Sequence, residues 1–308
     1  MESPKKKRCY YIPDNDNIFC HNCGWSSKPF KWIKEVSNCS NSDIIEEVKD
    51  YEVTIDITKD DEVVAKIHTE TLPKDSINLS DPLQRDYYSQ DKMFNMANEV
   101  IHNRRLDTAV NRPDNLYLSL CDMVHKNRLV IPFINEREEI EFYQTRTLRP
   151  QDNRTKPKYL GKVGSEKTLF NINKVSSDHD KVYIFEGPLN AFFTKNSVAV
   201  AGITERGKSF TKRQEEQYSG HLKWYDKVWI LDSQWVDRAS LIKSEVLLKQ
   251  GESVFIWPEK FGKRFKDFND IAMHCKVDEL SWDFIEKNTF VGLEGIVKMS
   301  EIKKYANA

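Results

Sequence analysis

Four short apolar runs recur in the second half of the chain, each bounded by polar residues. They are rich in β-branched and aromatic side chains, and charged stretches of helical spacing separate them, from residue 211 onward and at residues 237–250. A run of this kind is typical of a strand that is buried on both faces of a parallel sheet. The alternation of strands and helices therefore predicts a mostly parallel sheet flanked by helices. The predicted strands are residues 182–185, 197–202, 228–231 and 253–258.

The first half of the chain follows a different pattern. Residues 128–133 and 141–146 read as two antiparallel strands joined by a charged turn. Apolar residues recur at helical spacing over residues 91–106, which predicts a helix with one buried face. Residues 52–68 alternate like an extended hairpin, and the turn-rich residues 72–82 mark a boundary. The predicted fold class is thus α/β, with an α+β N-terminal subdomain before the parallel sheet.

Composition excludes some classes of protein. The 308 residues are 39% apolar and 31% charged, which allows two domains and a large core. With 47 basic and 48 acidic residues the net charge is -1, so overall charge gives no argument for nucleic acid. No stretch is long and apolar enough for a membrane span or a signal segment, which predicts a cytoplasmic protein. The six cysteines indicate reduced thiols, and we expect Cys121 and Cys275 in the core.

Two of the predicted strands run directly into an acidic residue. Glu186 follows the first strand and Asp232 follows the third. Ligands of open α/β sheets bind at the carboxyl ends of the strands, so these acids are candidates for a site. Two carboxylates 4 Å apart repel by about 4 kcal/mol at an effective dielectric near 20, so the pair needs a proton or a cation, and oxygen ligands suit Mg²⁺. The alternative is that each acid only caps the end of its strand.

Three motifs carry a resemblance to a known family. Their order and spacing resemble those of the Toprim domain of DnaG-type and tailed-phage DNA primases. That family has an acid where this chain has Asn190 and Gln234, so two negative charges are absent. The motifs are Glu186-Gly187-Pro188-Leu189-Asn190-Ala191, Asp232-Ser233-Gln234 and Lys266-Asp267-Phe268-Asn269-Asp270.

The resemblance implies a catalytic site for Mg²⁺ or Mn²⁺. The cations would bind triphosphate oxygens, activate the attacking 3′-hydroxyl and stabilise the leaving pyrophosphate. Glu186, Asp232 and Asp267 are the expected catalytic ligands. Further oxygen ligands are expected from Asn190, Gln234 and Asn269.

A basic stretch precedes the parallel sheet. Residues 147–164 contain five basic side chains and few acids, and composition alone leaves a solvated surface as an equal alternative. In the resembling family a subdomain with matching elements grips the template and the phosphates of the incoming nucleotide. The resemblance therefore implies nucleic-acid or nucleotide contacts from Arg146, Lys156, Lys158, Lys266 and Asn269.

The N-terminus carries one metal-binding pattern. Cys20 and Cys23 have the spacing of a zinc knuckle, and a structural zinc needs four ligands. Phage primase zinc ribbons are similar, but their first cysteine pair would lie upstream of Met1, so we interpret this arm as partial or degenerate. Cys9 and Cys39, or His21, would complete the zinc site. The alternative is an arm without zinc.

The resemblance predicts a DNA primase that joins ribonucleoside triphosphates on single-stranded DNA during phage replication. A separate hexameric helicase is the implied partner, because the chain has no G-x-x-x-x-G-K-[ST] motif. The alternatives are a Toprim nuclease and a catalytically weakened subunit that binds single-stranded DNA. The predicted segments are a zinc-ribbon arm (1–40), a connector (41–90), a basic mixed α/β primase subdomain (91–178), a Toprim catalytic domain (179–275) and a helical tail (276–308).

Overall fold

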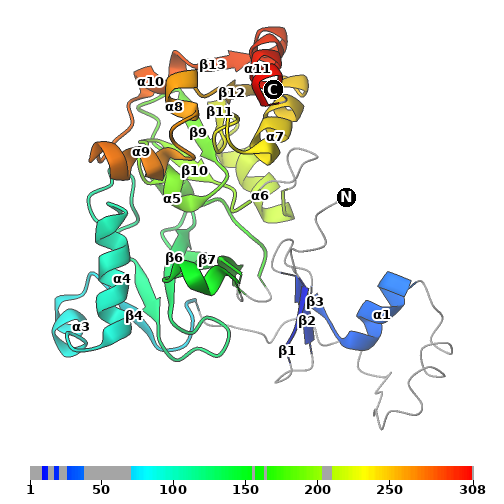
Figure 1. Cartoon of the computed structure of the whole chain (residues 1–308). Coiled ribbons are helices and arrows are strands. Elements are labelled where there is room, and N and C mark those ends of the chain that lie inside the picture. Colours follow the sequence, from blue (N-terminus) through cyan, green and yellow to red (C-terminus); the bar gives the residue numbers. More distant parts are fainter. Residues whose placement is uncertain are drawn as a thin grey trace. The chain divides into compact units, whose positions relative to one another are not determined.

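A computed structural model describes residues 9–12, 17–20, 26–37, 71–154, 157–162, 165–202 and 210–306 (Figure 1). The chain divides into two compact units. The first comprises Met1–Thr71 and Gly161–Glu166, and the second comprises Leu72–Leu160 and Lys167–Ala308. Each unit is described by itself below.

The first unit contains a small antiparallel sheet with the strand order β1-β2-β3. Its strands are β1 (Cys9–Ile12), β2 (Asn17–Cys20) and β3 (Ser26–Ser27), and helix α1 (Pro29–Ser37) follows. Phe19 on β2 is buried, and α1 begins at Pro29, where the missing N–H of proline costs no helical hydrogen bond. The hairpin predicted over residues 52–68 lies outside the described residues.

The second unit contains an antiparallel sheet with the strand order β4-β5-β6-β7-β8. The predicted strand pair is confirmed as β6 and β7, which pair in register from Arg128 opposite Thr147. Strand β4 and helix α3 fall within residues 41–90, so the structure assigns the second half of the expected connector to this unit. The elements are β4 (Ser76–Asn78), α3 (Pro82–Tyr87), α4 (Lys92–Asn103), β5 (Tyr117–Ser119), β6 (Arg128–Ile134), β7 (Ile140–Thr147), η3 (Pro150–Arg154) and β8 (Tyr159–Gly161).

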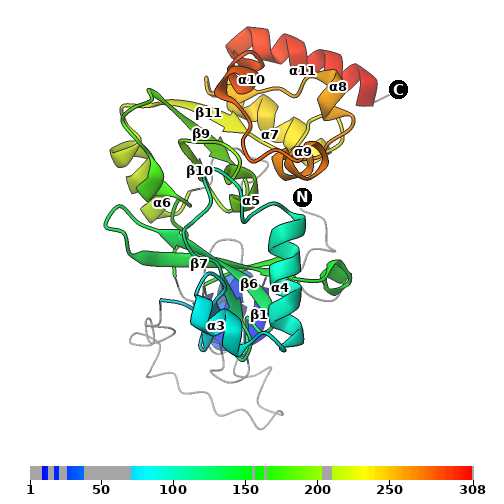
Figure 2. The ribbon, with the colours of Figure 1, turned by 90° about the vertical axis from the view of Figure 1, so that its left-hand side faces the viewer.

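Helix α4 is the helix predicted from the apolar spacing. The side chain of Asp91 caps its first turn by accepting hydrogen bonds from the backbone N–H groups of Met93 and Phe94. Phe94, Ala97 and Ile101 are its buried residues, as the spacing predicted. Figure 2 shows α4 beside strands β6 and β7.

The mostly parallel sheet has the strand order β10-β9-β11-β12-β13. All four predicted strands are present and pair in parallel. Strand β13 pairs antiparallel with β12 and lies in residues 276–308, where we predicted only helix. The strands are β9 (Lys181–Phe185), β10 (Ser197–Ala199), β11 (Asp226–Ile230), β12 (Ser253–Phe255) and β13 (Thr289–Val291).

Helices cover both faces of this sheet. Leu247 of α7 and Met299 of α11 belong to one apolar cluster, whereas Leu189 of α5 and Ile271 of α9 belong to the other. Figure 1 shows α7 and α11 side by side. The helices and short helical turns are η4 (Ile172–Lys174), α5 (Pro188–Ala191), α6 (Lys212–Glu216), the π-helix η5 (Gln217–His221), α7 (Arg238–Lys249), α8 (Glu259–Gly262), α9 (Phe268–Cys275), α10 (Trp282–Glu286) and α11 (Gly292–Ala306).

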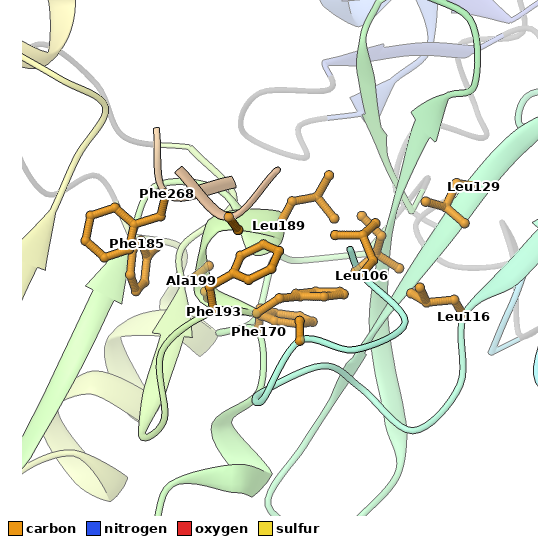
Figure 3. Packing of buried hydrophobic residues seen from close by; sticks show 14 of the residues in the cluster. Leu106, Leu116, Leu129, Phe170, Phe185, Leu189, Phe193, Ala199 and Phe268 are labelled. Carbon is orange, nitrogen blue, oxygen red and sulfur yellow. The ribbon is translucent and has the colours of Figure 1, made fainter. Parts of the chain in front are cut away.

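The apolar core explains why β9 is fixed so firmly. Tyr183 and Phe185 point into one cluster, and Val182 and Ile184 point into the other, so the strand is buried on both faces as predicted. The first cluster continues without a break into the antiparallel sheet. Figure 3 shows Phe185, Phe170 and Leu129 within it, together with the residues labelled there. The two sheets of the second unit therefore share one core.

The predicted burial of two cysteines is wrong. Cys121 lies in the turn after β5 and Cys275 is the last residue of α9, and both are exposed. Apolar neighbours in the sequence do not bury a side chain that lies at the end of an element. No helix within the described part of the chain is long and apolar enough to cross a membrane.

Gly262 offers a test of the packing next to the sheet edge. A Cβ atom at this position would overlap the indole of Trp235 and lie 2.9 Å from Cβ of Trp257. We expect Gly262→Ala to lower the free energy of unfolding by about 1–3 kcal/mol in urea denaturation, because the neighbours are rings and backbone-proximal atoms that cannot yield. Gly220→Ala is the control, because no atom lies within 4 Å of its Cβ position. Equal stability of the two variants would contradict this packing.

Candidate active site

The three predicted catalytic acids come from the edge of the parallel sheet that holds the carboxyl ends of its strands. Glu186 directly follows β9, and Asp232 lies two residues after the end of β11. Asp267 is the N-cap residue of α9, and its side chain accepts a hydrogen bond from the backbone N–H of Asp270 at 2.9 Å. Strand order places β9 next to β11, so Glu186 and Asp232 share one edge, and Asp267 is near enough to act on the charge of Asp232.

The electrostatics of Asp232 indicate that the acids act on one another. Burial, together with the carboxylates of Asp267 and Glu186, raises the pKa of Asp232 to about 7. Burial and the neighbouring Asp270 likewise raise the pKa of Asp267. These groups are short of positive charge, which is the condition under which a carboxylate cluster takes up a proton or a cation.

Asn190 links two of the acidic elements. Its Nδ2 donates to Oδ1 of Asp232 at 3.4 Å, and its Oδ1 accepts from the backbone N–H of Asn269 at 3.2 Å. The amide therefore orients the carboxyl group of Asp232 toward the start of α9. Asn190 thus lies beside Asp232, with both ends of its amide hydrogen-bonded within the protein.

Gln234 is placed differently from the expectation. It is 1% exposed, and its Nε2 donates to Oγ of Ser244 and to the carbonyl oxygen of Phe255. Its Oε1 accepts from the backbone N–H of Trp257 at 3.1 Å. Because both ends of the amide are used in tying the loop to β12 and α7, Gln234 is a structural residue and not a cation ligand.

Asn269 also has a structural partner that the sequence did not indicate. Its side chain accepts a hydrogen bond from Nη1 of Arg104 and donates to the backbone oxygen of Arg104 at 2.8 Å. Asn269 is 1% exposed, so it holds the end of α4 rather than facing a ligand. The contact brings Arg104 to the site.

Two lysines supply positive charge to the acidic edge. Nζ of Lys243, from α7, lies 2.8 Å from Oε1 of Glu186. Nζ of Lys266 lies 3.6 Å from Oδ2 of Asp232 and 4.0 Å from Oδ2 of Asp237. Each ammonium group is located where a bound cation would also be attracted.

A basic pocket of about 390 Å³ adjoins this edge. Arg104, Arg146 and Lys158 line it, with apolar contributions from helices α4 and α9. Partial burial and the charge of Arg146 lower the pKa of both Arg104 and Lys158. Nε of Arg146 is buried and has no hydrogen-bond partner among the described residues. Cations that repel one another in a pocket favour an anionic ligand.

Arg146 and Lys158 were expected from the sequence as contacts, whereas Arg104 was not. This residue follows the last turn of α4 as its C-cap, in the sequence Asn103-Arg104-Arg105. The only signal in the sequence was a basic pair at the end of an amphipathic helix. The pair is far from the three motifs in the sequence, so it could not be assigned to the site. The predicted contact Lys156 lies outside the described residues.

The described residues supply part of each expected metal site. In the first unit, Cys9 lies directly opposite Cys20 in the pairing of β1 with β2, whereas Cys23 and Cys39 lie outside the described residues. Within the described ranges, no three His, Cys, Asp or Glu side chains are close enough to enclose a metal ion. The acidic edge nevertheless fits a divalent cation chemically, because it offers carboxylate oxygens and a deficit of positive charge.

The pKa of Asp232 gives a prediction for stability against pH. The carboxyl group of Asp232 has a pKa of about 7 in the folded protein, against an ordinary pKa of 3.8. The folded state therefore keeps the proton of Asp232 at pH values where the unfolded state has lost it. The stabilisation from this protonated group is complete below pH 4 and is lost as the pH rises to 7. In EDTA, Asp232→Asn should therefore gain about 1–3 kcal/mol over the parent between pH 4 and pH 8, since each pKa unit corresponds to about 1.4 kcal/mol.

Urea denaturation at several pH values measures this difference. The control Asp283→Asn removes an exposed acid that pairs with Lys287 on α10, and it should show no such gain. Parallel stability curves for Asp232→Asn and the parent would contradict the raised pKa.

Comparison with known proteins relates the chain to primases. No family model matches the chain. It is 26% identical over 184 residues to the DNA primase of Enterobacteria phage T4, covering 59% of this chain and 49% of the relative. The chain thus matches about half the length of that protein.

Two solved structures are also similar in part. The zinc-binding and RNA polymerase domains of Aquifex aeolicus primase align with a TM-score of 0.44 and 16% identity, covering 99% of this chain and 82% of that one. The RNA polymerase domain of Mycobacterium tuberculosis primase DnaG aligns with a TM-score of 0.40 and 16% identity, covering 55% and 57%. The match to the phage T4 primase confirms the resemblance to phage DNA primases.

Proposed function

We propose that this chain is a DNA primase, which synthesises short RNA primers on single-stranded DNA by metal-dependent nucleotidyl transfer. The observation that carries the proposal is the basic pocket of Arg104, Arg146 and Lys158 beside the acidic edge. Joining nucleotides requires a cation at the reacting phosphate and positive charge along the rest of the triphosphate or the template. The sequence match to the phage T4 DNA primase supports the same function.

Glu186, Asp232 and Asp267 are the acids proposed to form the site of Mg²⁺ or Mn²⁺. When bound, such a cation would neutralise charge on the triphosphate and favour ionisation of the attacking hydroxyl group. Asn190 orients Asp232 through its amide. Lys266, which already lies near Asp232, is positioned to meet a phosphate oxygen that enters beside the acids.

The basic pocket is proposed to bind phosphate groups of the nucleotide or the template. Arg146 lines the pocket and supplies a positive charge, and its Nε is buried without a hydrogen-bond partner among the described residues. Asn269 fixes Arg104 in place, which reduces the entropy that the arginine loses on binding. Lys158 adds a third cation, and Lys156 is retained from the sequence as a further contact.

Two other partners complete the proposal. A separate hexameric helicase would supply unwound template, in the cytoplasm of the host cell. The thiols of Cys9, Cys20, Cys23 and Cys39 would bind one Zn²⁺, and the pairing of β1 with β2 supports the first two as neighbours. The zinc content of the purified chain measures this directly, and one ion per chain is the expected value.

A second candidate function is a subunit that binds single-stranded DNA with weakened catalysis. The structural role of Gln234 favours it, because the second motif then contributes one acid in place of two. A Toprim nuclease would use the same acids but does not explain the adjoining basic pocket. The following experiment separates these functions.

Primer synthesis is the direct test. With single-stranded template, ribonucleoside triphosphates and Mg²⁺, the parent chain should form dinucleotides and longer primers. Asp232→Asn should reduce the rate at least about a hundredfold, since loss of a charged group that acts on the transition state has effects of this size. Cleavage of the template without primer formation would indicate the nuclease. DNA binding with no synthesis by either protein would indicate the weakened subunit.

Salt dependence tests the basic pocket separately. Each contact between a basic side chain and a phosphate of single-stranded DNA contributes about 0.7 to the slope of log K against log salt. The double variant Arg104→Gln, Arg146→Gln should therefore weaken binding and lower the slope by about 1.4. The control is Arg149→Gln, since Arg149 already pairs with Asp152 at 3.1 Å. An unchanged slope in the double variant would show that Arg104 and Arg146 do not contact phosphate groups of the DNA.

A further inference from the structure

Lys243 is a buried cation in a helix that the three motifs do not include. It lies on α7 and is 7% exposed, alongside the buried residues Ser240, Ser244 and Leu247. A lysine is seldom buried to this extent unless its ammonium group is paired. The partner of Lys243 is Glu186, with Nζ and Oε1 at 2.8 Å.

The same turn of α7 fixes two features of the acidic edge. Ser244 accepts a hydrogen bond from Gln234, which turns that side chain away from the acids. Lys243, the preceding residue, reaches Glu186. The helix thus holds the neutral residue of the second motif in the core and brings a positive charge in beside the acid of the first motif.

The count of charges at the edge follows from this arrangement. Glu186, Asp232 and Asp267 contribute three negative charges when they are ionised. Asn190 and Gln234 contribute none, and Lys243 offsets the charge of Glu186 permanently because it is too buried to leave the site. Lys266 lies 3.6 Å from Asp232 and 4.0 Å from Asp237, but its side chain is 52% exposed, so it is not fixed at either acid. The acids without a buried counter-ion are therefore Asp232 and Asp267.

We propose that Lys243 is a positioning residue that holds Glu186 outside the coordination shell of the divalent cation and serves as its fixed counter-ion. A divalent cation would then be held by Asp232 and Asp267, and Glu186 would be oriented beside it by Lys243. This inference rests on the proposed metal-dependent function and refines its site. If the pair of Lys243 and Glu186 were only structural, removing the charge of Lys243 would not change the affinity for the cation. The proposal predicts that it does.

Binding of Mn²⁺ to the full chain, without nucleotide or template, is the test, followed by electron paramagnetic resonance of free Mn²⁺. Lys243→Met removes a positive charge near the cation, so it should bind Mn²⁺ at least about threefold more tightly than the parent. Glu186→Gln leaves Lys243 without its counter-ion and should bind Mn²⁺ more weakly. The double variant should return to an affinity near that of the parent, because the two charges are removed together.

The double variant decides between the two roles of Glu186. If Glu186 were a direct ligand, the double variant would bind Mn²⁺ more weakly than the parent, because removing Lys243 does not replace a lost ligand, and the proposal would be overturned. Equal or weaker binding by Lys243→Met, or no binding by either protein, would overturn it as well. Lys249→Met on the same helix is the control, since Lys249 is exposed and pairs with Glu245, and it should leave the affinity unchanged.

Two further measurements keep the result interpretable. Circular dichroism establishes that each variant is folded, and Lys243→Arg, which retains the charge, should keep the parent affinity if Lys243→Met is misfolded. Primer synthesis is measured in parallel at saturating Mn²⁺, where Lys243→Met should lose turnover although it binds the cation more tightly. If the parent makes no primers, the proposed function fails, but the four affinities still test the role of Lys243.

Discussion

Repulsion among carboxylates that a buried sheet holds together is the constraint on which the rest of the second unit depends. The acids after β9 and β11 cannot move apart, because the strands before them are packed into apolar clusters on both faces. Burial of each large apolar side chain contributes about 1.5–3 kcal/mol, so a few such residues offset the cost of crowding the charges. The core thus maintains an arrangement that the charges alone would disperse.

The protein moderates this repulsion with hydrogen bonds and cations from outside the acidic strands. Asn190 donates to Asp232, and the ammonium groups of Lys243 and Lys266 lie beside Glu186 and Asp232. Even so, the pKa of Asp232 stays raised to about 7. Compensation is therefore incomplete, and the remaining deficit of positive charge is the electrostatic basis for proposing a cation at this edge.

Much of the fold could be predicted from the sequence because its signals are local. Continuous apolar runs identified the parallel strands, and the acids after two of these runs, Glu186 and Asp232, indicated a site at the sheet edge. β13 was missed because its three residues are too few to show a period among the helices around them. The role of Gln234 could not be predicted from the sequence either. A glutamine amide can bind a cation or a backbone group, and only the fold determines which of the two lies within reach. Arg104 meets Asn269 across 165 residues of sequence, so no local pattern could pair them.

The first turn of α9 is shared by the acidic edge and the basic pocket. Asp267 begins it, the side chain of Asp270 accepts from the backbone N–H of Lys266, and Asn269 grips Arg104. A ligand that shifts either Asp267 or Arg104 would therefore move the same turn of backbone. By thermodynamic reciprocity, an anion in the pocket and a cation at the acids then change each other's affinity by equal factors. Binding at the proposed cation site and in the proposed phosphate pocket would therefore be coupled through this turn.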